Sequence, residues 1–220
     1  MWRFRLLGFP VSVHWTHGLV LVFASGIWAS TNPLQFRLGL VGVPIVFFSI
    51  LWHEFGHAWA FRRFGGNPRV RLHGFGGDAS AEGYFSRREN MIITLAGPAA
   101  GLVVGLSALP ALIFIDLPND YVRKIFSTLV YVNVIWSIVN LLPIYPLDGG
   151  QFLKHLLHGE ERVFRGKVGM VVSIFMAAAG LLFVGIFGPF MVFLFAYLAY
   201  LNWAMATFRF APDFRDAIPR

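Results

Sequence analysis

Residues 38–61 constrain the fold of this chain more than any other stretch, because they form an apolar run in which Glu54 is the only charged residue. A helix needs about 20 apolar residues to cross a bilayer. Four further uncharged runs are long enough to do so, and they cover residues 6–36, 90–115, 125–147 and 168–208. The last run is long enough for two helices and is expected to divide at Gly188 and Pro189. The sequence therefore predicts about six transmembrane helices.

The composition supports a membrane protein. Hydrophobic residues make up 57% of the chain and charged residues 13%, and the mean hydropathy is +0.65. A typical soluble domain has about 45–50% apolar and about 25% charged residues. The net charge of +7 does not indicate nucleic-acid binding, because the basic residues lie between the apolar runs and not on one soluble module. We therefore expect an all-α integral membrane protein, with residues 1–220 forming a single polytopic domain.

The positions of the basic residues predict the orientation in the membrane. If the N-terminus is cytoplasmic, 15 of the 18 Lys and Arg residues fall in cytoplasmic segments, and only Arg37, Arg123 and Lys124 fall outside. Cytoplasmic loops of membrane proteins carry an excess of Lys and Arg. We therefore expect a multi-pass protein of the cell membrane, with both termini and any active-site opening on the cytoplasmic side. Cysteine is absent, so neither disulfides nor thiolate ligands are available.

The run 38–61 contains the sequence His53-Glu54-Phe55-Gly56-His57. Two histidines four residues apart on a helix project from the same face and can bind one metal ion. Glu54 would then lie beside the metal and could accept a proton from an activated water, as in zinc hydrolases. The alternative is a purely structural polar cluster. It is disfavoured because an unpaired acid in hydrocarbon costs roughly 2.5 kcal/mol or more.

A second candidate motif covers residues 140–150. Its two prolines stop a regular helix, and a pair of glycines allows a sharp turn. Asp148 could therefore fold back toward the metal as a third ligand, leaving the fourth position for water. The amide of Asn140 could donate a hydrogen bond to a substrate carbonyl or to the oxyanion formed from it. An ordinary turn carboxylate and an interhelical hydrogen bond remain the alternatives for these two residues.

Residues 65–85 predict short strands at the membrane face after the second helix. Val70, Leu72 and Phe75 alternate with more polar residues, and glycines surround them. An exposed edge within residues 70–77 could pair with an extended peptide. The candidate substrate-binding residues are Gly74, Phe75, Gly76 and Gly77. A merely structural hairpin is an equally good explanation of this segment.

Other small and polar residues in the apolar runs indicate structural roles. Gly97, Gly101 and Gly105 recur every fourth residue, a spacing that lets transmembrane helices approach closely. His14 and His17 would share a face of the expected first helix, where metal binding is conceivable but polar contacts are favoured. The last two helices contain Asn202 as their strongly polar side chain and are expected to support or gate the core.

The two motifs, in this order, resemble those of the site-2 protease family of intramembrane zinc metalloproteases, family M50. The resemblance covers roughly residues 38–152. It implies one Zn²⁺ per chain bound by His53, His57 and Asp148. It also implies that Glu54 is the general base and that Asn140 positions or stabilises the scissile carbonyl.

The function implied is hydrolysis of peptide bonds in transmembrane segments of other proteins, as part of regulated intramembrane proteolysis. The expected partners are a transmembrane protein substrate and the lipid bilayer, with no nucleic acid. The alternative is a non-proteolytic membrane metal-binding protein or transporter that uses the same ligands. A transporter should have polar residues along a path through both leaflets, whereas the acids here cluster toward the cytoplasmic half. This asymmetry favours an enzyme.

Overall fold

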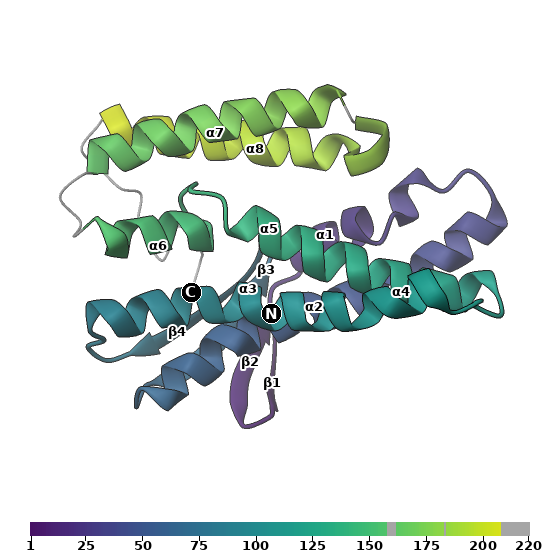
Figure 1. The fold of residues 1–220 in the computed structure, drawn as a ribbon, viewed down its shortest axis with the longest axis horizontal. Helices are drawn as coiled ribbons and strands as arrows, with labels where there is room; N and C mark the ends of the chain where they lie inside the picture. Colours follow the sequence, from purple (N-terminus) through teal and green to yellow (C-terminus); the bar gives the residue numbers. More distant parts are fainter. Residues whose placement is uncertain (158–161, 183, 208–220) are drawn as a thin grey trace. The chain divides into compact units, whose positions relative to one another are not determined.

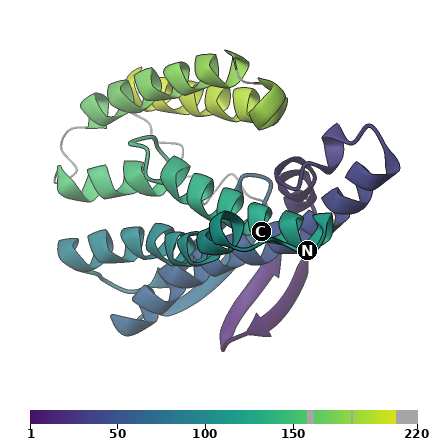
Figure 2. The same cartoon turned by 45° about the vertical axis from the view of Figure 1, so that its right-hand side comes forward.

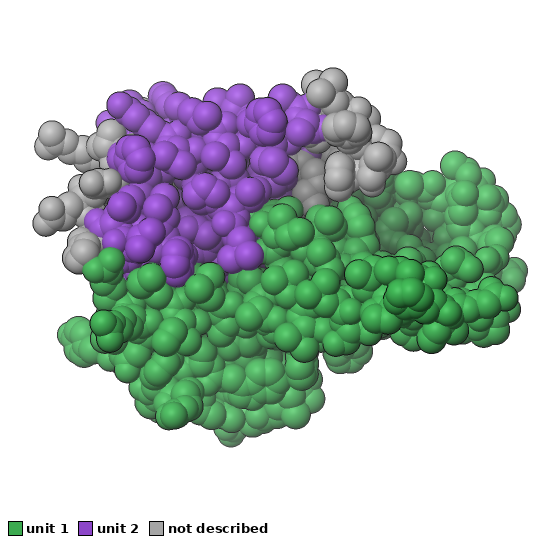
Figure 3. Space-filling model, viewed as in Figure 1, with its two compact units in different colours: residues 1–139 green, residues 140–220 purple. Residues whose placement is uncertain are grey.

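A computed structural model of the chain describes residues 1–157, 162–182 and 184–207 (Figure 1). It contains two compact units, residues 1–139 and residues 140–220, which are coloured separately in Figure 3. Each unit is described by itself below. The C-terminal end, which is expected to be cytoplasmic, lies outside the described residues.

The first unit contains a four-stranded sheet with the order β1-β2-β3-β4. Strands β1 and β2 are antiparallel, β2 and β3 are parallel, and β3 and β4 are antiparallel. In this register Val11 lies opposite Val70, and Leu72 lies opposite Gly77. The strands are β1 (Trp2–Leu6), β2 (Phe9–Val13), β3 (Asn67–His73) and β4 (Gly76–Glu82). The predicted strands after the second long apolar run are therefore present, as part of a larger sheet.

The expected helix over residues 6–36 is wrong. This segment contains the β1–β2 hairpin, drawn as purple arrows in Figure 2, followed by the short helix α1 (His17–Ala24) and the 3₁₀ turn η1 (Ile27–Ala29). Phe9 and Val11 are buried and alternate with more exposed neighbours, which is the period of a strand. The partner of Val11 on β3 is Val70, which lies far along the chain, so hydropathy alone could not reveal the pairing.

The long helices of the first unit match three of the expected membrane spans. They are α2 (Pro33–Arg63), α3 (Arg87–Phe114) and a continuous helical stretch made of α4 (Asp120–Val130), the π-helical η2 (Tyr131–Ile135) and α5 (Trp136–Asn140). Within the described part of the chain, these are the three helices long and apolar enough to cross a membrane. The protein is thus mostly helical with a small sheet, and three of the expected six spans are present as candidate spans among the described residues.

Local sequence explains where two of these helices begin. The Asn32 side chain accepts a hydrogen bond from the Gln35 backbone N–H, and Pro33 occupies the first turn of α2, where its missing N–H is not needed. Helix α3 begins with a capping box in which Ser86 and Glu89 satisfy each other's backbone N–H groups. Both long helices therefore start at defined residues at the ends of the apolar runs.

One face of the sheet packs against α2 and forms the core of the first unit. Phe9, Val11, Val70 and Leu72 of the sheet are at most 2% exposed and share one cluster with apolar residues of α2. The cluster extends along α2 from Val46 to Ala58, so the sheet supports the part of the helix that carries the His-Glu-His motif.

The second unit contains α6 (Asp148–Leu156), α7 (Arg162–Leu182) and α8 (Val184–Thr207). Helices α7 and α8 lie side by side in both views (Figures 1 and 2). The last apolar run thus forms two helices, as expected, but the predicted break at residues 188–189 is wrong, because α8 continues through them. Pro189 lies near the start of α8, and a proline is best tolerated near the beginning of a helix.

Candidate active site

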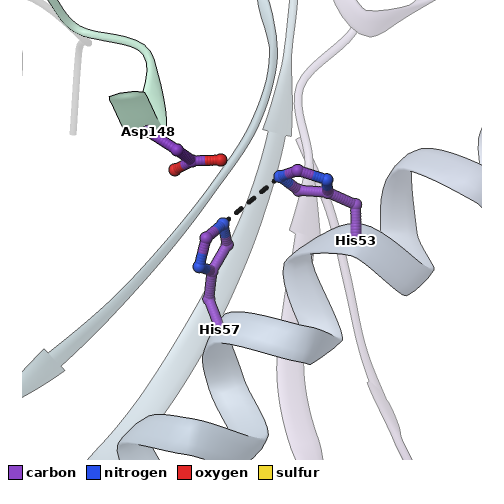
Figure 4. Close-up of side chains that lie close together, drawn as sticks. All are labelled: His53, His57 and Asp148. Atoms are coloured by element: carbon purple, nitrogen blue, oxygen red, sulfur yellow. Dashed lines mark hydrogen bonds between the residues drawn. The ribbon is translucent and has the colours of Figure 1, made fainter. Parts of the chain in front are cut away.

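The His53 and His57 side chains lie one turn apart on α2 and are only 3% and 7% exposed. Their Nε2 atoms are 3.3 Å apart, a contact marked by the dashed line in Figure 4. Two histidines that bind one tetrahedral zinc at about 2.0–2.1 Å place their nitrogens about 3.3–3.4 Å apart. The spacing of this pair therefore fits a shared zinc ion.

A hydrogen bond defines which His57 nitrogen can bind a metal. His57 Nδ1 lies 2.7 Å from the carbonyl oxygen of Ile93 on α3. A carbonyl oxygen only accepts hydrogen bonds, so Nδ1 carries the proton. In the neutral ring Nε2 then has a free lone pair, and this is the atom that faces His53. Metal-binding histidines commonly donate their second N–H in this way, which fixes the ring.

Helix α3 offers glycines where the motif needs space. A Cβ atom at Gly97 would lie 2.5 Å from Cε1 and 2.6 Å from Cδ2 of His57, and nearer still to Nε2. A Cβ at Gly101 would lie 2.5 Å from Ser137 Oγ and 3.8 Å from His53 Nδ1. These glycines therefore do more than let helices pack closely, because Gly97 also makes room for the His57 ring and Gly101 for the Ser137 hydroxyl.

The Glu54 side chain is 3% exposed and lies against the beginning of β4. A Cβ at Gly77 would be 2.6 Å from Glu54 Cγ and 2.8 Å from Oε1. The neighbouring Gly76 has φ +117° and faces the Trp136 ring, whose Cζ2 would be 2.6 Å from a Cβ. Of the four candidate substrate-binding residues, Gly77 thus lies against the Glu54 side chain and Gly76 lies against the Trp136 ring.

The position of the open sheet edge differs from the sequence expectation. Val70, Arg71 and Leu72 pair with β2 on one side and with β4 on the other, so the prediction of an edge is wrong for this part of residues 70–77. Gly74 and Phe75 form the turn, and Gly76 and Gly77 begin β4. No other described strand pairs with the outer side of β4. The edge was misplaced because the partner strand β2 lies in the run that was expected to be helical.

In the second unit, Asp148 is the first residue of α6, where a negative charge interacts favourably with the helix dipole. The predicted sharp turn is present. Side chains at Gly149 and Gly150 would collide with the backbone carbonyls of Leu141 and Ile144. Asn140 is the last residue of α5 and is half-buried. Asp148 therefore remains the expected third metal ligand, presented at the start of α6.

The N-terminal histidines make polar contacts, as favoured from the sequence. His14 Nδ1 lies 2.7 Å from Thr16 Oγ1, and His17 Nδ1 lies 3.1 Å from the carbonyl oxygen of His73. Burial lowers the pKa of His17 below its ordinary value, so this side chain is favoured in its neutral form. Asp78 lies on β4, close to the β3–β4 turn. Burial alone would raise its pKa, but hydrogen bonds and charges from His73 and Arg71 outweigh burial, so the pKa of Asp78 is lowered.

Two polar residues of the apolar helices were not assigned a role from the sequence. Asn202 on α8 is 0% exposed and forms hydrogen bonds with the backbone of Tyr145. Ser137 on α5 is equally buried, and its hydroxyl has no hydrogen-bond partner among the described residues. Both Asn202 and Ser137 could have been singled out from the sequence, because a polar side chain within an apolar helix indicates a specific role. The sequence does not indicate which residues they contact.

Comparisons with known proteins relate the chain to zinc metalloproteases. Residues 115–183, which include Asn140 and Asp148, match the model of Peptidase family M50. A zinc metalloprotease of Methanocaldococcus jannaschii is 26% identical over 186 residues, which cover 81% of this chain and 53% of that protein. Rip3 of Mycobacterium tuberculosis, a candidate zinc metalloprotease, is 30% identical over 198 residues, covering 80% of this chain and 50% of Rip3. The chain therefore spans about half the length of the curated relatives it matches.

The fold is that of a site-2 protease. The structure of the site-2 protease from Methanocaldococcus jannaschii aligns with a TM-score of 0.62, over 93% of this chain and 94% of that one, at 21% identity. The resemblance to the site-2 protease family, first found in two motifs, is thus supported by the family match, the relatives and the fold. The zinc metalloprotease relatives and the His53–His57 pair indicate Zn²⁺ as the cofactor.

Proposed function

We propose that this chain is an intramembrane zinc endopeptidase that hydrolyses peptide bonds in transmembrane segments of other proteins, in regulated intramembrane proteolysis. The observation that carries the proposal is the His53–His57 pair, whose Nε2 atoms are buried in an apolar helix at the spacing of two zinc ligands. Asp148 is the proposed third ligand. A transporter built on the same ligands is not favoured, because the zinc-binding relatives are named as proteases.

Each residue of the site has a distinct role in the proposed reaction. When bound, Zn²⁺ polarises the scissile carbonyl and lowers the pKa of water. Glu54 accepts the proton of the attacking water and delivers it to the departing amine. The Asn140 amide donates a hydrogen bond to the carbonyl oxygen as negative charge develops on it. The Ile93 carbonyl holds the His57 ring in the tautomer that leaves Nε2 free for metal.

We also propose that the substrate binds as an added strand along the outer edge of β4, with Gly74–Gly77 at the catalytic end of this edge. Strand addition presents backbone groups to the enzyme without requiring a particular side-chain sequence. The contact between Gly77 and Glu54 supports this proposal, because a peptide paired with the start of β4 would pass near the general base. The substrate helix must unwind first, since a helical peptide bond is already hydrogen-bonded internally.

The proposed topology keeps α7 and α8 as membrane helices and places both termini and the site opening at the cytoplasmic face of the cell membrane, with residues 1–220 acting as one catalytic domain. The distribution of basic residues supports this orientation. Pairing between β2 and β3 supports it further, because it requires residues 9–13 and 67–73 to lie on the same side of the membrane.

The variant Glu54→Gln tests the proposed chemistry, because it removes a base without removing a metal ligand. Purified wild-type protein should contain about one zinc per chain and cleave a transmembrane peptide in detergent. The variant should retain the zinc and lose cleavage. Comparison of membrane fragments from cells with each form would then identify natural substrates. Normal turnover by Glu54→Gln would rule out the proposed mechanism.

A further inference from the structure

In the second unit, an unassigned set of polar contacts is made by Asn202, which lies in the C-terminal part of the apolar helix α8. Its Oδ1 atom accepts a hydrogen bond from the Tyr145 backbone N–H at 3.1 Å. Its Nδ2 atom donates to the Tyr145 carbonyl oxygen at 2.7 Å and to the Leu198 carbonyl oxygen at 2.8 Å. One amide therefore satisfies both backbone groups of a single loop residue and also uses its second N–H. This leaves only one orientation of the amide compatible with all three bonds.

Helix α7 is shaped to admit this side chain. A Cβ at Gly169 would lie 2.6 Å from Asn202 Cγ and nearer still to Oδ1. A Cβ at Gly166 would lie 2.9 Å from the Asn202 carbonyl oxygen and 2.8 Å from the Ala206 nitrogen. Small residues let neighbouring apolar helices approach closely. Here they also hold the amide in one place between α7, α8 and the loop.

The loop residue that Asn202 holds is directly connected to Asp148. Tyr145 precedes Asp148 by three residues. On the other side of the turn, a Cβ at Gly150 would lie 2.5 Å from the Ile144 carbonyl and 2.7 Å from the Tyr145 nitrogen, so α6 begins in close contact with this segment. Ile144 is itself 0% exposed. The backbone on both sides of Asp148 therefore has little freedom once Tyr145 is held.

We propose that Asn202 is a positioning residue of the metal site: it holds the segment 141–147 so that α6 presents the Asp148 carboxylate in a single orientation. An apolar side chain could fill the same space in α8, but it could not bond to both backbone groups of Tyr145. The inference rests on the proposed role of Asp148 as the third zinc ligand. Asn202 does not contact the reacting atoms in this proposal.

Zinc affinity, measured by chelator competition on the full chain in detergent, tests the proposal. Asn202→Ala removes the amide, and Asn202→Leu replaces it with an apolar side chain that is likewise branched at Cγ. Loss of a group that orients a metal ligand typically weakens metal binding by about 10- to 100-fold. Both variants should show a loss in this range, a changed absorption spectrum of the Co²⁺-substituted site, and a lower kcat with little change in KM.

Ser173→Ala is the matched control. Ser173 is also 0% exposed and lies on α7, but its hydroxyl donates to the Gly169 carbonyl oxygen at 2.7 Å and not to the loop. This variant should lower thermal stability without changing zinc affinity more than about twofold. Gly169→Ala should displace the amide and weaken zinc binding, yet add little when combined with Asn202→Ala, because both changes act through the same contact.

Zinc affinity within about twofold of wild type in both Asn202 variants would overturn the positioning role, whatever their melting temperatures. Equal weakening by Ser173→Ala and the Asn202 variants would also overturn it, since the effect would then follow general packing. Wild-type protein that binds zinc no better than His57→Ala would instead refute the metal site on which the inference rests. That comparison is made first, so the two failures are distinguishable.

Discussion

The variant Gly97→Ala should abolish zinc binding through a single added methyl group. The new Cβ would lie 2.5 and 2.6 Å from two carbon atoms of the His57 ring, whereas ordinary van der Waals contact begins at 3.4 Å. The ring must therefore move by about 0.9 Å or more, unless the helices separate by a similar amount. Metal–ligand distances tolerate deviations of only about 0.2 Å. We expect zinc affinity to fall by more than about 100-fold, beyond the usual effect of losing an outer-sphere contact.

A second glycine variant separates metal binding from catalysis in the same assay. Gly77→Ala would place its Cβ 2.6 Å from Glu54 Cγ, and the three atoms nearest to this Cβ all belong to Glu54. It should therefore retain zinc but lose peptide cleavage. Gly18→Ala in α1 is the control, because nothing lies within 4 Å of its Cβ, and it should leave both properties unchanged. Zinc content would be measured on folded protein after gel filtration, together with the melting temperature.

Normal zinc affinity in a folded Gly97→Ala protein would refute the reasoning, because it would mean that His57 is not held against α3 as described. Loss of zinc in Gly77→Ala would also count against it, since the metal site would then depend on the position of β4.

Three further predictions follow from the same structure. Asp148→Asn should lose most bound zinc in a metal assay, and full retention would remove Asp148 from the ligand set. Reporter fusions within residues 65–85 should be cytoplasmic and one near Asp120 should be on the opposite side, so an external hairpin would refute the proposed orientation. Because burial lowers the pKa of His17, its contribution to stability is complete above the unfolded value of 6.5 and is lost as the pH falls below it. Thermal unfolding should therefore depend less on pH below 6.5 in His17→Asn than in the wild type.

The elements that could be predicted from the sequence are those set by local spacing. Four residues separate His53 from His57, so any helix through this run places the two rings on one face. The prolines and glycines of residues 140–150 likewise imply a bend with local causes, and the structure contains it. Three of the apolar runs form helices long enough to cross a membrane, because length and hydropathy determine that property directly.

The parts that were missed depend on partners far along the chain. The run 6–36 satisfies the same hydropathy criterion as a membrane helix. However, Val11 pairs with Val70, although the whole of α2 lies between them in the sequence, and this pairing makes residues 9–13 a strand. The consequence reaches the site, because β3 becomes an inner strand and, of the β3–β4 hairpin, β4 alone lies at an edge of the sheet.

Asn202 shows the same limit at the scale of one side chain. Its position in an apolar helix indicates that its amide must be satisfied, but the partner, Tyr145, is 57 residues earlier. Neither residue belongs to a recognisable motif with the other. Only the folded second unit brings them into contact. Their contact also joins the apolar helix α8 to the segment that carries Asp148. A helix expected to support or gate the core therefore acquires a specific connection to the proposed chemistry.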